Sequence, residues 1–316
     1  MKIMDLSRIT CDRPRTIFLE FSWARCSCLI LLLTLAPLVE AKAATTVDRV
    51  LYEQGFLQVV SPDRATAEQA RALAKKVLAA WKFDLSVMHW ANLNEMQKLL
   101  TLRLVSDARM NEGHHGRAYS LANGTFVVRM SLIGDPSIDL TFAHELGHIQ
   151  AYRAFRGRAV PHYFIEGHGL MMNVLYADQL RQDRRAAGAA QGRVMMALTP
   201  EEVRTILTDE EKSKREPNME VAGLFFVEYL RVRKNIPDAV PRMGRVFELV
   251  GRGRTYEQAF GQTYGLSLKQ AVSEIVAYLK RTEARPAERI RGTRFEEYLP
   301  ARRDSTSREG RGANDQ

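Results

Sequence analysis

The sequence has few cysteines, and all of them lie near its beginning. Cys11, Cys26 and Cys28 are the only three among 316 residues. Beyond residue 28 the chain therefore cannot form a disulfide bond or a metal site with thiolate ligands. This absence excludes a zinc finger, an iron–sulfur cluster and a cysteine protease for the body of the protein.

A long apolar run is also lacking. Ser27–Val39 carries no charge, but its 13 residues fall short of the roughly 20 that a helix needs to span a bilayer. Five Lys and Arg residues precede this run, and the small-residue pattern Ala41-Lys42-Ala43 follows it. These features are typical of a secretory signal peptide over residues 1–43. We expect export to the periplasm or the medium and no transmembrane span in the mature chain; an uncleaved anchor is the alternative.

The overall composition is that of a globular protein with a basic surface. Hydrophobic residues make up 46% of the chain and charged residues 26%, which excludes a collagen-like or wholly disordered chain. The formal net charge of +9 favours association with anionic envelope components. Basic and aromatic residues do not alternate near Arg181–Arg185, as they would in a single-strand binder, so we expect no specific nucleic-acid partner.

Hydropathy patterns predict an α+β fold, with a small strand-and-helix region first and a mainly helical region after it. The expected strands are Gly55–Val60, Leu99–Val105 and Thr125–Ser131, and a helix over Thr66–Trp81 lies between the first two. Further helices are expected over Ser137–Phe155, from near Glu166 towards Ala186, from Thr199 onward, and over Glu220–Arg233, Val240–Val250, Thr255–Phe260 and Ser267–Leu279. We therefore expect one domain over residues 44–285 and a basic, largely disordered tail over 286–316.

The segment His144-Glu145-Leu146-Gly147-His148 lies within one of these expected helices. Histidines four residues apart share one helix face and can bind one zinc ion. A carboxylate directly after the first histidine can accept a proton from water at the open coordination position. His144 and His148 are therefore candidate metal ligands, and Glu145 is a candidate general base.

A catalytic zinc site keeps three protein ligands and one open position. The candidates for the third ligand are Glu166, His162 and His168. Glu166 is separated from His148 by 17 residues and is expected to open the next helix. A loop and one helical turn can bring it back to face the histidines.

HELGH followed by the segment FIEGHG resembles the gluzincin branch of zinc metallopeptidases, and more closely the compact bacterial members of the peptidase MA clan. The resemblance covers roughly residues 50–280 and includes the later segment GLFFVEYL. It implies that His144, His148 and Glu166 bind one zinc ion per chain and that Glu145 is the general base. It also implies that Thr125–Ser131 is the edge strand that aligns the substrate. The implied function is an exported zinc-dependent metallopeptidase that hydrolyses peptide or protein substrates.

The sequence departs from the thermolysin pattern in the residues that would support the metal. Thermolysin has an Asp four residues after the third ligand, where this chain has Leu170, so we expect support from elsewhere, such as Asn173. His168, Tyr163 and Tyr229 are candidate oxyanion donors or supporting residues. Glu220 stands where compact members often carry a Tyr. The alternative function is therefore a zinc-binding but catalytically weak exported binding or assembly factor.

Overall fold

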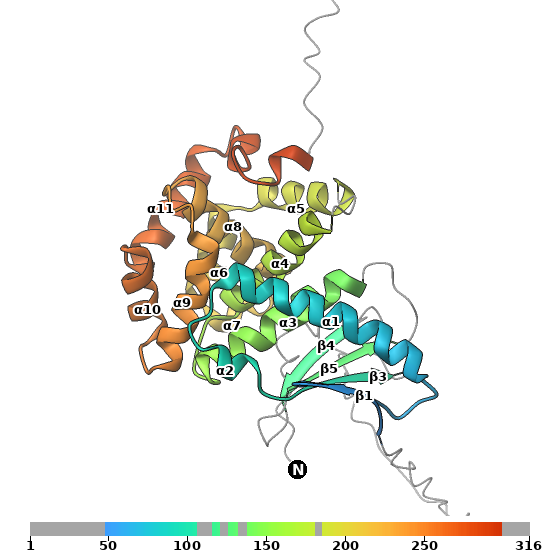
Figure 1. The fold of residues 1–316 in the computed structure, drawn as a ribbon. Coiled ribbons are helices and arrows are strands. Elements are labelled where there is room, and N and C mark those ends of the chain that lie inside the picture. Colours follow the sequence, from blue (N-terminus) through green and yellow to red (C-terminus); the bar gives the residue numbers. More distant parts are fainter. Residues whose placement is uncertain (1–47, 106–115, 121–125, 132–137, 181–184, 299–316) are drawn as a thin grey trace, which may run out of the picture.

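The computed structural model describes residues 48–105, 116–120, 126–131, 138–180 and 185–298 (Figure 1). The expected signal peptide and residues 299–316 of the expected tail lie outside these residues. Among the helices of the described ranges, none is both long and apolar enough to cross a membrane. The described part of the chain has the expected α+β architecture, with strands first and helices making up most of the remainder.

The strands form one five-stranded mixed sheet in the order β1-β2-β3-β5-β4. Its strands are β1 (Arg49–Gln54), β2 (Leu57–Ser61), β3 (Leu100–Val105), β4 (Gly116–Ser120) and β5 (Phe126–Ser131). The pairs β2–β3 and β3–β5 are parallel, whereas β1–β2 and β4–β5 are antiparallel.

The expectation that residues 125–131 form the edge strand is wrong. This segment is β5, which pairs with β3 on one side and with β4 on the other. The edge beside it is β4, a five-residue strand that the sequence patterns did not reveal. Its segment Gly-Arg-Ala-Tyr-Ser carries little of the β-branched apolar content that marks strands.

Two helices lie between β2 and β3, of which α1 (Ala67–Met88) packs on the sheet, and the other helices follow β5 and pack largely on one another (Figure 1). Those that carry or surround the site are α1, α3 (Ile138–Phe155), α4 (His162–Gln179), α8 (Met219–Val232) and α9 (Ala239–Gly251). The others are α2 (Leu93–Met96), α5 (Arg185–Ala197), α6 (Pro200–Thr208), α7 (Glu210–Ser213), α10 (Tyr256–Tyr264) and α11 (Leu268–Arg281).

Capping residues explain several helix starts. Thr66, Thr199 and Thr255 each accept a hydrogen bond from the backbone N–H three residues on, and a Gln or Glu side chain at that third residue accepts the threonine N–H in return. Such reciprocal caps satisfy two backbone donors that the helix leaves free. The expected start at Thr199 with Pro200 in the first turn is confirmed.

Several helix boundaries differ from expectation: α1 continues past Trp81 to Met88, α10 continues past Phe260 to Tyr264, and two differences concern α4. α4 begins at His162, so Glu166 lies in its second turn and does not open the helix. α4 also ends at Gln179, and a separate helix, α5, begins at Arg185 where one helix was expected to continue to Ala186. Pro161 sets the start of α4, because its ring fixes φ near the helical value just before the first turn.

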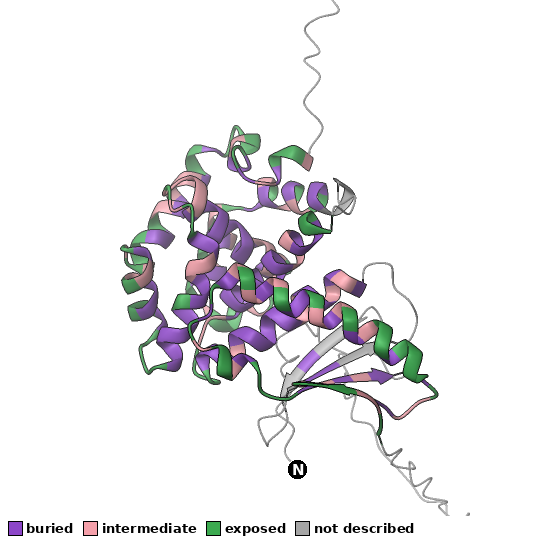
Figure 2. Cartoon of the chain, viewed as in Figure 1, coloured by how far each residue is buried: buried purple, intermediate pink, exposed green. Residues whose placement is uncertain are grey.

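Helix α3 is the centre of the packing. It contacts α1, α4 and α9, and thirteen of its eighteen residues are buried (Figure 2). Among them Phe142, Leu146 and Ile149 are fully buried. A helix that is buried on most of its surface holds its side chains in fixed positions, which suits a helix that carries ligands.

The segment expected to begin the disordered tail packs on the helices as far as residue 298. Arg289 is only 4% exposed and donates hydrogen bonds to the carbonyls of Met196, Leu198 and Leu279. Phe295 is fully buried. The domain therefore extends beyond residue 285.

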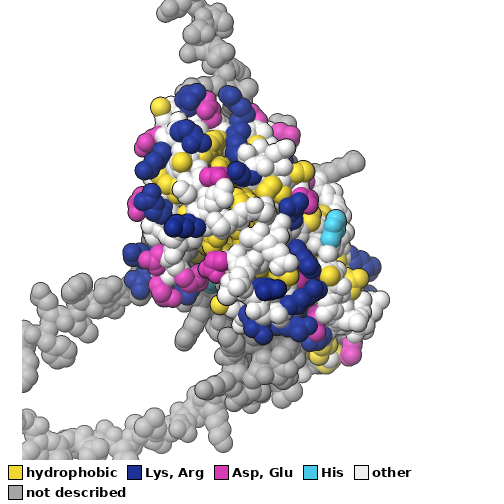
Figure 3. All heavy atoms as spheres, turned by 90° about the vertical axis from the view of Figure 1, so that its left-hand side faces the viewer, with side chains coloured by type: hydrophobic (Ala, Val, Ile, Leu, Met, Phe, Trp, Pro, Cys, Tyr) yellow, Lys and Arg dark blue, Asp and Glu magenta, His cyan; other side chains and the backbone are white. Residues whose placement is uncertain are grey.

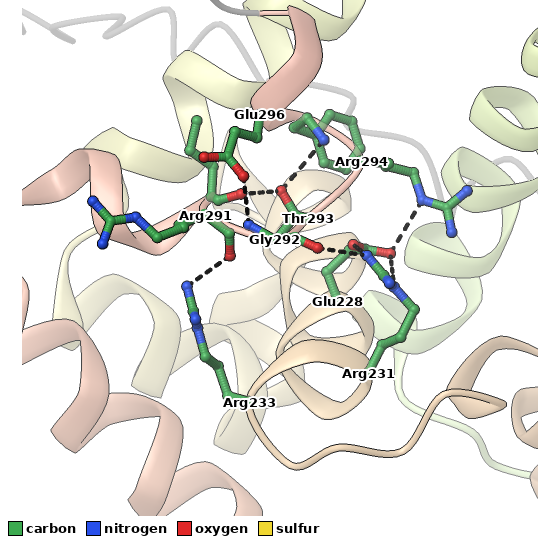
Figure 4. Close-up of polar contacts among 10 residues, drawn as sticks. Glu228, Arg231, Arg233, Arg291, Gly292, Thr293, Arg294 and Glu296 are labelled. Carbon is green, nitrogen blue, oxygen red and sulfur yellow. Dashed lines mark hydrogen bonds and ion pairs between the residues drawn. The ribbon is translucent and has the colours of Figure 1, made fainter.

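Arginines of α8 hold the same segment (Figure 4). Arg231 and Arg233 donate to carbonyls of Gly292 and Arg291, and the buried Glu228 carboxylate pairs with both Arg231 and Arg294. Because Glu228 is fully buried, these two partners supply the charge compensation that it needs.

Helices α4 and α8 cross at two glycines. A methyl group added to Gly223 would overlap the carbonyl oxygen of Tyr163, and one added to Gly167 would lie 2.6 Å from the carbonyl carbon of Gly223. These neighbours are backbone atoms, which cannot turn aside as a flexible side chain can.

We therefore predict that Gly223→Ala lowers the free energy of unfolding by about 2–3 kcal/mol, because it forces the two backbones apart. Gly261→Ala is the matched control, since the nearest atom to its added methyl group is 3.9 Å away. The control is expected to raise stability by up to about 1 kcal/mol, as alanine favours a helix. Urea unfolding measures both, and equal stability of the two variants would contradict the prediction.

Candidate metal centre

The two histidines of HELGH lie together on one face of α3, as their spacing predicts. The imidazole centroids of His144 and His148 are 4.5 Å apart, and their Nε2 atoms are 2.9 Å apart. His148 is 8% exposed. Both rings therefore direct the same nitrogen to one point.

Helix α4 returns alongside α3 and brings Glu166 to this point. Oε2 of Glu166 is 3.7 Å from Nε2 of His144 and 3.4 Å from Nε2 of His148. In a tetrahedral zinc site with bonds of about 2.0 Å, neighbouring ligand atoms lie about 3.3 Å apart. The three spacings scatter around that value, so this group could hold a metal ion.

The surroundings of Glu166 also fit a cation. The residue is 1% exposed, and neither carboxylate oxygen has a hydrogen-bond partner among the residues that the structure describes. A buried carboxylate without partners is costly unless a cation neutralises it. A metal ion between Glu166 and the two imidazoles would remove that cost.

Opposing effects set the pKa values of this group. Burial acts to lower the pKa of His144, but the carboxylates of Glu166, Glu145 and Glu220 outweigh it and raise the pKa to about 9. Burial acts to raise the pKa of Glu166, but the neighbouring His148 and His144 outweigh it and lower the pKa well below its ordinary value. The site therefore favours positive charge between its ligands.

Glycine at position 169 allows α4 to approach the ligands. A methyl group added there would lie 2.7 Å from Cε1 of His148 and 3.1 Å from Cε1 of His144. Any side chain larger than hydrogen would press on both rings and move their Nε2 atoms. Glycine inside a helix is unfavourable and marks a packing or functional requirement, so Gly169 was a signal in the sequence that we did not use.

Glu145 reaches from α3 to the edge strand. Its Oε2 accepts a hydrogen bond of 2.8 Å from the backbone N–H of Ala118 in β4. This bond holds the carboxylate beside the metal group and connects the helix of the ligands to the open edge of the sheet. Because β4 was not expected, the sequence analysis did not identify Ala118.

The other two candidates for the third ligand lie outside the metal group. The backbone N–H of His162 donates to Glu210 of α7, and its Nδ1 lies 4.0 Å from the same carboxylate. His168 is fully buried, and its ring lies against the rings of Trp90 and Phe247. Burial and the charges of His148 and His144 lower the pKa of His168 to about 3, so it is neutral.

The remaining expected site residues point to other partners. The Tyr163 hydroxyl is 3.1 Å from that of Tyr256, and the Tyr229 ring packs on Tyr278 of α11. The side-chain amide of Asn173 donates to the carbonyl of Leu140, one turn before the ligands on α3. These interactions place neither tyrosine hydroxyl among the metal group, and they make Asn173 a contact between α3 and α4.

Comparison with known proteins adds no relative. No family model matches the chain, and no curated protein matches it. The site is therefore inferred from the arrangement of its own residues alone.

We predict that the purified protein binds about one zinc ion per chain and that His148→Ala loses it, because two ligands hold a metal far more weakly than three. His89→Asn is the control: His89 is exposed, and Asn tolerates its positive φ of 50°. Elemental analysis after dialysis measures the zinc content of the protein and of each variant. Zinc retained by His148→Ala would contradict the site.

Zinc binding should also depend on pH. A ligand must lose its proton before it binds the metal, and the pKa of His144 in the metal-free protein is raised to about 9. Below that pH zinc displaces a proton, so the apparent affinity should rise about tenfold per pH unit as the pH approaches 9. Competition with a chromophoric chelator at several pH values measures this slope. A flat profile would contradict the raised pKa.

Proposed function

We propose that the protein is an exported zinc-dependent metallopeptidase of the gluzincin type. The observation that carries the proposal is the convergence of His144, His148 and the buried Glu166 carboxylate, with the Glu145 carboxylate near enough to act on His144. Two histidines and one glutamate are a ligand set of catalytic zinc sites in peptidases. The coarse fold agrees, since α3 and α4 carry the ligands and the sheet borders them.

Zinc at this site would acidify a water molecule and polarise the carbonyl of a peptide bond. The proton transfers are carried out by a residue of the chain. Glu145 takes the proton from the attacking water and passes it to the leaving amine. The N–H of Ala118 holds one oxygen of Glu145, which keeps the carboxylate in place and leaves its other oxygen for the proton.

The edge strand β4 supports a peptide as the substrate. Within the described residues it pairs with β5 alone, and the N–H of Ala118 donates to Glu145 of α3. An extended peptide can bind an open strand edge through main-chain hydrogen bonds. A substrate bound along β4 would pass directly beside the proton acceptor.

Export and a basic surface complete the proposal. The amino-terminal segment has the pattern of a signal peptide, and Lys and Arg side chains are spread over the face formed by α9, α10 and α11 (Figure 3). Such a surface suits a protein that works beside anionic envelope polymers or lipid head groups.

A second candidate is an exported zinc-binding factor that does not hydrolyse peptides. The observation that favours it concerns the support of the ligands: within the described residues, Nδ1 of His148 is buried and has no hydrogen-bond partner. Catalytic zinc histidines usually donate this second N–H to a carboxylate or carbonyl, which orients the ring.

Glu145→Gln distinguishes the two functions. We predict that it lowers the rate of peptide hydrolysis by at least about 10³-fold, because the amide cannot accept the proton. The zinc content should stay at that of the unchanged protein, since Glu145 is not a ligand. A peptide library analysed by mass spectrometry measures cleavage. Glu201→Gln, an exposed acid in the first turn of α6, is the control. Equal cleavage by Glu145→Gln and the control would contradict the assigned base.

A further inference from the structure

Glu220 lies in the first turn of α8, a helix that packs against α4, which carries Glu166. Gly223 rests on the α4 backbone between Tyr163 and Gly167, which directly follows the ligand Glu166. Residues three apart share one face of a helix. Glu220 is therefore on the face of α8 that is turned to α4, one turn from the crossing point.

The electrostatics of the site agree with this placement. Burial raises the pKa of Glu220, and the charges of His144, Glu166, His148 and Glu145 all act on it. In return, the Glu220 carboxylate helps to raise the pKa of His144. Its carboxylate is thus within electrostatic range of both imidazoles, the third ligand and the proton acceptor.

Other acidic residues in the same helical region have partners. Glu202 takes part in the cap of α6 and accepts a hydrogen bond from Asn218, and Glu228 pairs with two arginines. Among the described residues, Glu220 makes no hydrogen bond or ion pair, although it is only partly exposed. An acid at position 220 is favoured because it lies near the amino terminus of a helix. That preference does not explain why the Glu220 side chain is enclosed beside three other residues of the site.

The Glu220 carboxylate lacks a positive charge to balance it, even when a divalent ion is bound. A divalent ion supplies two positive charges, whereas Glu145, Glu166 and Glu220 supply three negative ones. One negative charge stays uncompensated in a site that excludes part of the solvent, where charge interactions are stronger than in water. In its ionised form the Glu220 carboxylate accepts hydrogen bonds and donates none, which suits a cationic partner and not an oxyanion.

We propose that Glu220 binds a cationic group of the substrate, an ammonium or a guanidinium, next to the scissile bond. This inference rests on the proposed peptidase function. The protein then prefers peptides that carry a positive charge close to the cleaved bond. The cation has two possible sources, the free amino terminus of a short peptide or a Lys or Arg side chain.

Matched peptides test the preference in the zinc-loaded protein. One series compares a free amino terminus with an acetylated one, and the other compares Lys with the neutral isostere norleucine. We expect kcat/KM to be roughly 10-fold to 100-fold higher for the cationic member of one series, as for hydrogen bonds between charged groups. The series that shows the preference identifies the source of the cation.

Glu220→Gln should abolish this preference: the ratio of kcat/KM for the cationic peptide to that for the neutral peptide should fall to about 1, and a general effect of the substitution on the rate cancels in this ratio. Glu201→Gln, which removes an exposed acid from the first turn of another helix, should retain it. The zinc content of Glu220→Gln should equal that of the unchanged protein. A preference that survives in Glu220→Gln, no preference in the unchanged protein, or loss of zinc from Glu220→Gln would each overturn the proposal.

A binding measurement keeps this test separate from that of peptidase activity. Fluorescence anisotropy of labelled peptides on zinc-loaded Glu145→Gln should show the same preference for the cation, and the added change Glu220→Gln should remove it. If no peptide is cleaved but this pattern holds, the peptidase proposal fails and the role of Glu220 stands. If peptides are cleaved but cationic and neutral peptides bind equally well, the proposed role of Glu220 fails and the peptidase proposal stands.

Discussion

The enclosure of the Glu166 carboxylate against two imidazoles is the interaction on which the rest of the site depends. Within the described residues, neither oxygen of this 1% exposed side chain has a hydrogen-bond partner, and the imidazoles of His148 and His144 lie 3.4 and 3.7 Å from it. Burial removes the hydration of this carboxylate, and in the metal-free chain only these two imidazoles compensate for the loss. A metal ion bound by Glu166, His144 and His148 would turn this cost into binding energy that also stabilises the folded chain.

Close helix packing makes this enclosure possible, and glycines allow the packing. Gly169 brings α4 against the two ligand rings of α3, and Gly167 with Gly223 brings α8 against the other side of α4. The same approach places Glu220 near the metal group. These short backbone distances therefore position both Glu166, the candidate third ligand, and Glu220, which is proposed to bind a positive charge of the substrate.

The sheet contributes through a single strand. β4 forms the edge of the sheet, and its Ala118 N–H holds Glu145, so the proton acceptor and the open strand edge lie side by side. This contact links the two parts of the α+β fold at the point where the proposed chemistry occurs. The proposed peptide substrate, the proposed general base and the candidate metal ligands then lie close together.

The sequence by itself determined the α+β order, most helices and the position of the two HELGH histidines on one helix face, because helical periodicity and the four-residue spacing are local properties. It also singled out Glu166, although its expected place at the start of α4 was wrong. Only the tertiary structure decided that Glu166, and neither His162 nor His168, meets the two histidines, that β4 is the edge strand, and that Tyr163 and Tyr229 have other partners. Those outcomes depend on how helices and strands that are distant in the chain pack together. The spacing of residues along the sequence does not reveal that packing.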